Sequence, residues 1–129
     1  MHKLFYIFDP HQKTVLLQKT KKGFDGLFLS ELDEDIGASE HFEKEYGVYI
    51  KELGVKGLID YPDDLLQLTG VYTAKTGLIY NVKTEKKIVR VEDLFEINLA
   101  PQAQQLLPLC IWPDVKSFRI WRENDDTTT

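Results

Sequence analysis

The chain has 129 residues, of which 43% are hydrophobic and 29% are charged, and this composition is typical of one globular domain with a single core. Its formal net charge of -5 argues against a general nucleic-acid binder and a binder of acidic membranes, because both depend on clustered Lys and Arg. Cys110 is the one cysteine, which excludes a disulfide framework and a thiolate metal site. It lies in an apolar run, so we expect a buried small side chain rather than a nucleophile.

The first part of the chain predicts a β-hairpin followed by a loop. Residues 4–8 and 14–18 are short β-rich runs, and the turn-forming residues 9–12 separate them. The first run is far too short for a secretion signal or a membrane-spanning helix, so we expect a cytoplasmic protein that binds no membrane. The expected loop covers residues 19–23.

The middle of the chain predicts strands. Three are expected at 48–53, 57–61 and 65–74. Gly54 and Pro62 are predicted to end the first two, and Gly70 to interrupt the third. Residues 78–91 then predict two more strands, joined by a polar turn at 83–87.

The last part predicts a second helix and one more strand. The helix is expected at 100–107, with Pro101 in its first turn, where a proline fits. The strand is expected at 118–121, and residues 123–129 are predicted to be a disordered tail. No internal repeat is visible, so residues 1–122 are expected to form a single domain of the α/β (α+β) class.

Residues 26–48 have the length and both terminal glycines of the pattern G-x5-E-x7-R-E-U-x-E-E-x-G-U, in which U is a bulky apolar residue. The pattern fits without a gap and matches at Gly26, Phe42, Glu45, Gly47 and Val48. The mismatches are Leu32 for the first glutamate, Glu40 for the arginine, His41 for the next glutamate and Lys44 for the first paired glutamate. The helix of this segment is expected to run from Ser39, as its N-cap, to Tyr46, with Gly47 ending it in a left-handed conformation.

This segment resembles a Nudix box that has lost most of its catalytic side chains. The resemblance continues at residues 88–94, which are similar to the family's W-V-P-L-D-E-L strand and turn, and at residues 98–101 and 106–109, which are similar to its last helix. Together these cover most of residues 3–122. The resemblance to the Nudix hydrolase superfamily implies a Nudix-like α/β/α sandwich with a mixed central sheet and a nucleotide-sized cleft beside the box helix.

In that family the box helix presents carboxylates that hold Mg2+ against a diphosphate. Glu45 is the only retained box carboxylate. Mg2+ requires oxygen ligands, whereas His41 offers nitrogen and Lys44 places a positive charge where the metal would be. We therefore expect the Nudix metal site to be lost.

A frame shifted by one residue would recover carboxylates from Glu31, Glu40 and Glu43. Helix geometry argues against this shift. At about 100° per residue, positions 41, 44 and 45 form one stripe, from whose centre Glu43 points about 150° away and Glu40 about 90° away. Glu40 and Glu43 are therefore expected to be a solvated edge of the helix.

Two functions are compatible with this box. The first is a noncatalytic Nudix-fold protein that binds a nucleotide, another phosphorylated metabolite or a protein partner without a cofactor. His41 and Lys44 would offer hydrogen bonds and positive charge to a phosphate, with help from loop lysines such as Lys19 and Lys22. The alternative is a hydrolase of nucleoside diphosphate derivatives with a rebuilt Mg2+ or Mn2+ site. Its ligands would come from Glu45, Glu31, Glu40, Glu43 and Glu85.

A third function is an interaction domain in which the fold is only a scaffold. Exposed aromatic side chains would favour it, and the candidates are Tyr61, Trp112 and Trp121. Other aromatic residues are expected to line the core or a pocket, where one of them could stack on a base; these are Tyr72, Tyr80, Phe95 and Phe118.

Overall fold

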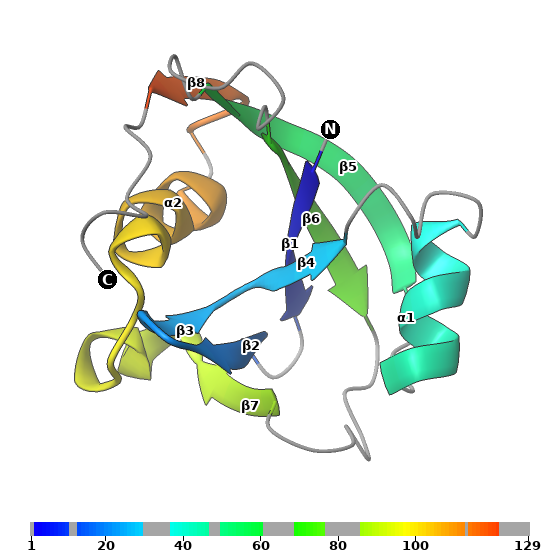
Figure 1. Cartoon of the computed structure of the whole chain (residues 1–129), viewed down its shortest axis with the longest axis horizontal. Coiled ribbons are helices and arrows are strands. Elements are labelled where there is room, and N and C mark those ends of the chain that lie inside the picture. Colours follow the sequence, from blue (N-terminus) through cyan, green and yellow to red (C-terminus); the bar gives the residue numbers. More distant parts are fainter. Residues whose placement is uncertain are drawn as a thin grey trace.

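The computed structural model describes residues 2–10, 13–29, 37–46, 50–60, 69–76, 86–112 and 114–121. Eight strands in these residues form one mixed sheet, in the order β3-β2-β1-β6-β5-β8, with β4 paired to β1 and β7 paired to β2. Helix α1 (Ala38–Tyr46) covers one face of the sheet and helix α2 (Pro101–Ile111) covers the other (Figure 1). The predicted α/β/α sandwich with a mixed sheet is confirmed.

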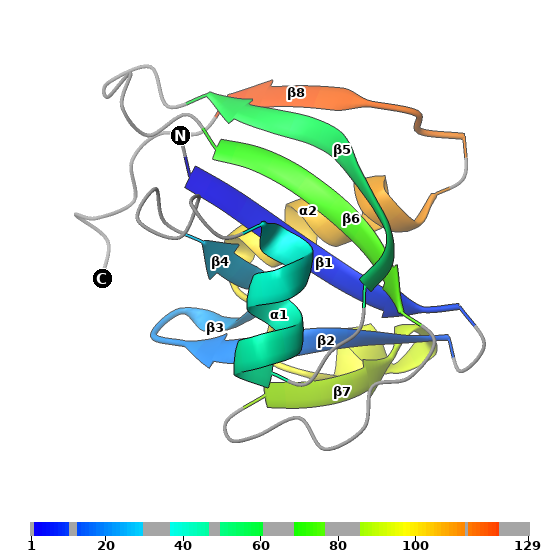
Figure 2. The same cartoon turned by 90° about the vertical axis from the view of Figure 1, so that its right-hand side faces the viewer.

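Strand β1 (His2–Asp9) is the central strand of the sheet. It pairs antiparallel with β2 (Thr14–Thr20), as the predicted hairpin requires, and its first half pairs antiparallel with β4 (Leu27–Leu29). On the opposite edge, β1 pairs in parallel with β6 (Thr69–Thr76). The two views in Figures 1 and 2 show β1 between these neighbours, with α1 crossing in front of the sheet in Figure 2.

The predicted loop at 19–23 is wrong, because a tight hairpin occupies these residues. Lys19 and Thr20 belong to β2, and Gly23 begins β3 (Gly23–Asp25). The Thr20 hydroxyl donates to the Gly23 carbonyl at 2.6 Å and accepts from the Lys22 backbone N–H at 3.2 Å. Gly23 has φ +125°, a conformation that favours glycine.

Glycine does not interrupt the strands where the sequence predicted. Strand β5 (Ile50–Asp60) runs through Gly54, and β6 runs through Gly70. The irregularities of β5 are instead two register shifts against β6, one between Ile50 and Glu52 and one between Val55 and Gly57. Strand β8 (Phe118–Trp121) pairs in parallel with β5 and confirms the last predicted strand.

Strand β7 (Lys86–Arg90) pairs antiparallel with β2, so its first two lysines extend the strand rather than the predicted turn. The other strand predicted within 78–91 lies outside the described residues, as does the tail at 123–129. A 3-10 helix, η3 (Val91–Glu96), leads toward α2, which starts at Pro101 as predicted and extends to Ile111. Neither helix in the described part of the chain is long and apolar enough to cross a membrane.

Side chains alternate between the two faces of the sheet and fill two cores. The larger core lies under α2 and η3 and contains Leu4, Tyr6, Val15, Leu17, Ile59, Val71, Val89, Leu94, Ala100, Ala103, Leu106 and Leu107. The smaller core lies under α1 and contains Phe5, Ile7, Leu16, Leu27, Leu29, Phe42 and Ile50. We call these sides the α2 face and the α1 face.

Candidate functional site

The candidate site begins at Gly26, the first glycine of the box, which joins β3 to β4. A Cβ atom at this position would overlap the carbonyl oxygen of Phe5 and come within 3.0 Å of the Tyr6 ring. Asp25 precedes it and is only 3% exposed. Its Oδ1 accepts from the Gly26 N–H at 2.7 Å and from the Tyr6 hydroxyl at 2.8 Å, and its Oδ2 accepts from Gln102 Nε2 at 3.3 Å. The first position of the box, Gly26, therefore accommodates only glycine.

The box helix is fixed to the sheet by Phe42. This side chain is fully buried, and its ring meets the edge of Phe5 with centroids 4.8 Å apart and an interplanar angle of 75°. The helix begins at Ala38. The His41 N–H donates to the Gly37 carbonyl at 2.9 Å, so the N-cap position is Gly37, two residues before the predicted Ser39, which is itself helical. Gly47, Val48 and Leu32 lie outside the described residues.

The buried Phe42 decides which way the predicted ligand residues point. His41 is half-buried, and its ring lies 5.6 Å from that of Phe42 in an edge arrangement. Lys44 is exposed in the last turn of α1, where its positive charge interacts favourably with the negative end of the helix dipole. Glu40 and Glu43 are exposed, as expected for a solvated edge.

Three acidic candidates cannot be placed as ligands. Glu45 lies in α1, but its side chain is not described, and Glu31 and Glu85 lie outside the described residues. Among the side chains that the structure describes, no three of His, Cys, Asp or Glu are grouped so that they could hold a metal ion.

The structure does not bring Lys19 to the box helix. Val15 and Leu17 of β2 point to the α2 face, and strand alternation gives Lys19 the same direction. Phe24, its cross-strand partner, also packs against the core of the α2 face. Lys22 is exposed in the hairpin turn. Lys19 and Lys44 therefore lie on opposite faces of the sheet.

An aromatic row, which we define as His41, Phe42, Phe5 and Tyr72, crosses the α1 face beside the box helix. Phe5 stacks on Tyr72 with centroids 5.0 Å apart and 20° between the rings. Lys3 extends the row, because its Nζ lies 5.9 Å from the Tyr72 centroid. Tyr72 and Lys3 are half-buried.

Lys3 was not among the residues predicted for a site, and Tyr72 was predicted as a core or pocket residue that could stack on a base. Parallel pairing of β1 with β6 puts Phe5 opposite Tyr72 in register. Gly70 leaves room for the tyrosine ring, because a Cβ there would come 2.9 Å from Tyr72 Cε2. The alternation of β1 contained a signal for Lys3, since it lies two residues before the buried Phe5.

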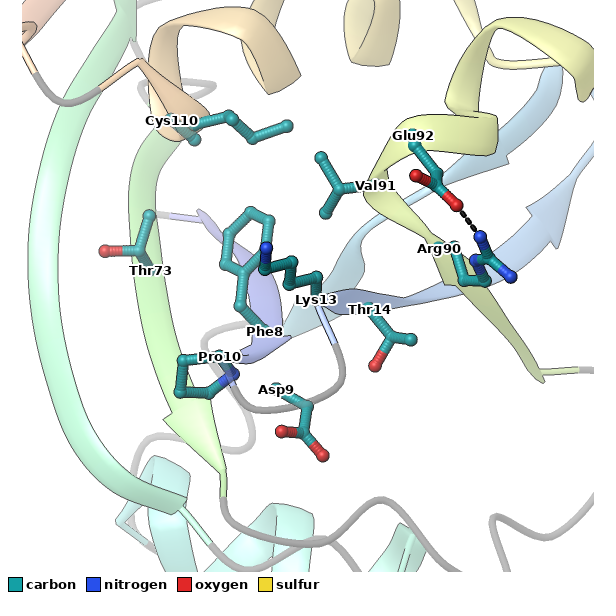
Figure 3. Close-up of a pocket in the computed structure, with 11 residues that line it drawn as sticks. Phe8, Asp9, Pro10, Lys13, Thr14, Thr73, Arg90, Val91, Glu92 and Cys110 are labelled. Atoms are coloured by element: carbon teal, nitrogen blue, oxygen red, sulfur yellow. Dashed lines mark ion pairs between the residues drawn. The ribbon is translucent and has the colours of Figure 1, made fainter.

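A cavity of about 900 Å3 lies at the other end of β1, between the β1–β2 hairpin and the C-terminal end of α2. Figure 3 shows Phe8, Lys13 and Cys110 among the residues that line it, with the Arg90–Glu92 ion pair at one side. Cys110 lines this cavity and packs against the larger core. Burial raises the pKa of its thiol to about 12, so this cavity contains no reactive thiolate at neutral pH.

The chain is similar to known proteins in its structure and not in its sequence. No protein-family model and no curated protein sequence matches the chain. A mutator MutT protein from Bacillus halodurans matches 96% of this chain and 90% of its own, with 12% identity and a TM-score of 0.57. A Nudix hydrolase from Nitrosomonas europaea matches 95% of this chain and 79% of its own, with 14% identity and a TM-score of 0.59.

Two structures of NrtR from Shewanella oneidensis are also similar. The Nudix domain of NrtR, in complex with ADP ribose, matches 82% of this chain and 80% of its own, with 18% identity and a TM-score of 0.50. NrtR in complex with a 27mer DNA matches 84% of this chain and 58% of its own, with 14% identity and a TM-score of 0.54. These similarities cover between 82% and 96% of this chain. The chain therefore has the Nudix fold.

Proposed function

We propose that this chain is a noncatalytic Nudix-fold protein that binds a phosphorylated ligand, a nucleotide above all, directly on the α1 face. The ligand's phosphates would meet Lys44 and His41 of the box helix. Its base would lie toward Tyr72 and Lys3. No divalent metal takes part in this binding.

The orientation of the box helix carries the proposal. With Phe42 buried against Phe5, positions 41, 44 and 45 share one side of α1. Two of these three positions hold an imidazole and an ammonium. Neither fits Mg2+, which is bound through oxygen, whereas both donate charge-assisted hydrogen bonds to phosphate oxygens when protonated.

The aromatic row supports a nucleotide over a simple phosphate. Bases stack on aromatic side chains, and Tyr72 is half-buried with a lysine beside it. The Nudix domain of NrtR binds ADP ribose, a ligand with both a base and a diphosphate. This favours the same class of ligand here.

The second candidate is a metal-dependent hydrolase of nucleoside diphosphate derivatives. The Nitrosomonas europaea protein is itself named a Nudix hydrolase. A hydrolase here needs Glu45 together with other carboxylates. Glu40 and Glu43 are exposed, which argues against a role as buried ligands that converge on one metal ion. The expectations that the chain binds no nucleic acid and resides in the cytoplasm stay predictions, and NrtR is one Nudix-fold protein that binds DNA.

A calorimetric titration with ATP in EDTA tests the proposal, comparing the unchanged protein with Lys44→Glu. We expect binding without metal, and we expect the substitution to weaken it at least about tenfold, because a charge-assisted hydrogen bond contributes about 1.5–3 kcal/mol. Lys116→Glu is the matched control, since Lys116 is also exposed but lies in the segment before β8. It should leave the affinity unchanged.

A hydrolysis assay separates the two candidates. With Mg2+ or Mn2+, we expect nucleoside triphosphates, diphosphates and their sugar or dinucleotide derivatives to react no faster than in buffer. Turnover that Glu45→Gln abolishes would establish the hydrolase instead. Binding that requires Mg2+, or that is the same in Lys44→Glu, would refute direct phosphate binding by the box helix.

A further inference from the structure

A groove of about 970 Å3 lies on the outer side of the α2 face, between η3 and α2. Its apolar walls include Leu94, Phe95, Leu107, Pro108, Ile111 and Trp112. The groove is separate from the aromatic row, because the sheet and the larger core lie between them. An inference about this groove is therefore independent of nucleotide binding.

Large apolar side chains of the groove are exposed to solvent. Phe95 is 96% exposed, Trp112 is 60% exposed and Ile111 is 37% exposed. Single exposed apolar side chains scattered over a surface are ordinary. Three in one groove form a patch, and such patches mark interaction sites. Trp112 is held in place, because its indole Nε1 donates to Asp114 Oδ2 at 3.1 Å. An ordered, exposed tryptophan is the side chain most enriched at the energetic centres of protein interfaces.

Among the described residues, the one charged residue that lines the groove, Asp114, is acidic. All its walls belong to residues 91–114, a segment that contains Glu92, Asp93, Glu96 and Asp114 but no Lys, Arg or His. Arg90 forms ion pairs with the first two acids, at the start of η3. Asp114 lines the groove and its Oδ2 accepts the Trp112 indole, and the exposed Glu96 follows the lining residue Phe95 in sequence. The charge that complements this groove is positive.

We propose that the groove is the docking site of a basic amphipathic segment of a partner protein. Two or three large apolar side chains of that segment would cover Phe95 and Trp112, and its Lys or Arg side chains would meet Glu96 and Asp114. A second copy of the chain fits less well, because its net charge is -5 and a symmetric contact would oppose acidic groups. An anionic membrane surface is repelled by the same acids.

The two tryptophans of the chain allow a direct test. Trp121→Phe leaves Trp112 as the sole tryptophan, and Trp112→Phe leaves Trp121, which is 76% exposed and is not part of the groove. The probe is a synthetic peptide of about 18 residues that contains only Leu and Lys, with Leu on one helical face. A peptide with Glu in place of Lys is its control. Neither peptide contributes tryptophan fluorescence.

With the Leu/Lys peptide, we expect a saturable blue shift of Trp112 emission and no change of Trp121 emission. Phe95→Ser should weaken this binding about tenfold or more, as truncation of an interface anchor does. Glu96→Lys, which leaves the hydrogen bond between Trp112 and Asp114 in place, should weaken it at least several-fold. Val55→Ser and Glu52→Lys alter exposed residues of β5 outside the groove and should have no effect.

Four results would overturn the proposal. The first is equal binding of the Leu/Glu peptide, and the second is a change in Trp121 emission in place of Trp112 emission. The third is a shift of Trp112 emission with phosphatidylserine vesicles alone. The fourth is a dimer in sedimentation that Phe95→Ser dissociates. The last two would assign the groove to a membrane or to a second copy. Failure of ATP to bind would leave this proposal intact, because the nucleotide site lies on the α1 face.

Discussion

The hydroxyl of Tyr6 donates a hydrogen bond to Oδ1 of Asp25 at 2.8 Å, between the central strand and the residue that precedes the box. Both residues are almost fully buried. The same carboxylate oxygen accepts the N–H of Gly26, so one buried acceptor ties β1 to the entrance of the box. This bond connects the α2 face of the sheet to the start of the segment that carries the box helix on the α1 face.

Tyr6→Phe is expected to destabilise the protein by about 1–3 kcal/mol, because it removes a donor from a buried acceptor and leaves the ring in place. Urea unfolding measures this change. Gln102→Ala removes the longer contact at 3.3 Å, from a half-buried side chain, and should cost less than Tyr6→Phe. Equal stability of Tyr6→Phe and the unchanged protein would show that the bond adds nothing.

Gly26→Ala is expected to destabilise the protein by about 1–3 kcal/mol or more, because the new Cβ would overlap the Phe5 carbonyl and press on the Tyr6 ring. Gly54→Ala is the matched control. Gly54 is exposed in β5 and has no atom within 4 Å of an added Cβ, so its substitution should be neutral or stabilise by up to about 1 kcal/mol. Thermal melts of the two variants that coincide would contradict this explanation of the box glycine.

Local sequence patterns predicted much of the fold. The hairpin of β1 and β2, the box helix, α2 and β8 all follow from apolar runs and turn residues that lie close together in the chain. Gly54 and Gly70 were misread as breaks in strands. The first stands in open space and the second makes room for Tyr72, and neither reason is visible without the neighbouring strand.

Phe95 was predicted to line the core or a pocket, and its 96% exposure makes the core assignment wrong. It lies in a 3-10 helix, which has three residues per turn, so Val91, Leu94 and Ile97 share the inward side and Phe95 falls outside it. Phe118, by contrast, does pack against the larger core. Tyr80 and Tyr61 lie outside the described residues.

The candidate site was predictable only in part. The box pattern located α1 and the inward direction of Phe42, since both depend on spacing along one helix. The aromatic row depends on the parallel pairing of β1 with β6, which joins Phe5 to Tyr72 across more than sixty residues of sequence. Long-range register of this kind is not encoded in local periodicity.

Cys110 predicts a specific response to alkaline pH. Burial raises the pKa of its thiol from 9.0 to about 12, with a smaller opposing effect of Lys56. The folded protein keeps the thiol proton at pH values where the unfolded chain loses it. The contribution of Cys110 to stability is therefore fully present below about pH 9 and is lost as the pH rises toward 12.

Comparison with Cys110→Ala tests this response. The difference in unfolding free energy between the two proteins should be constant below about pH 8.5 and should shrink above it. Alkylation by iodoacetamide at pH 8 should be about a thousandfold slower in the folded protein than in guanidinium, because so little thiolate is present. Rapid alkylation of the folded protein would show that the thiol is accessible and ordinary.

Tyr72 predicts a difference between two ligands. If the base of a nucleotide stacks at the aromatic row, Tyr72→Ala should weaken ATP binding by about 1–3 kcal/mol, or roughly 5- to 150-fold, and should leave inorganic pyrophosphate unaffected. Gly70→Ala should act in the same direction, since its Cβ would displace the Tyr72 ring.

Lys44→Glu is the matched comparison for Tyr72→Ala, because it removes a phosphate contact and not a base contact. It should weaken ATP and pyrophosphate alike. Calorimetry of both ligands with these variants therefore separates the two halves of the site. If Tyr72→Ala weakens pyrophosphate as much as ATP, the substitution acts through the packing of Phe5 and the box helix, and the aromatic row is a structural support rather than a base-binding surface.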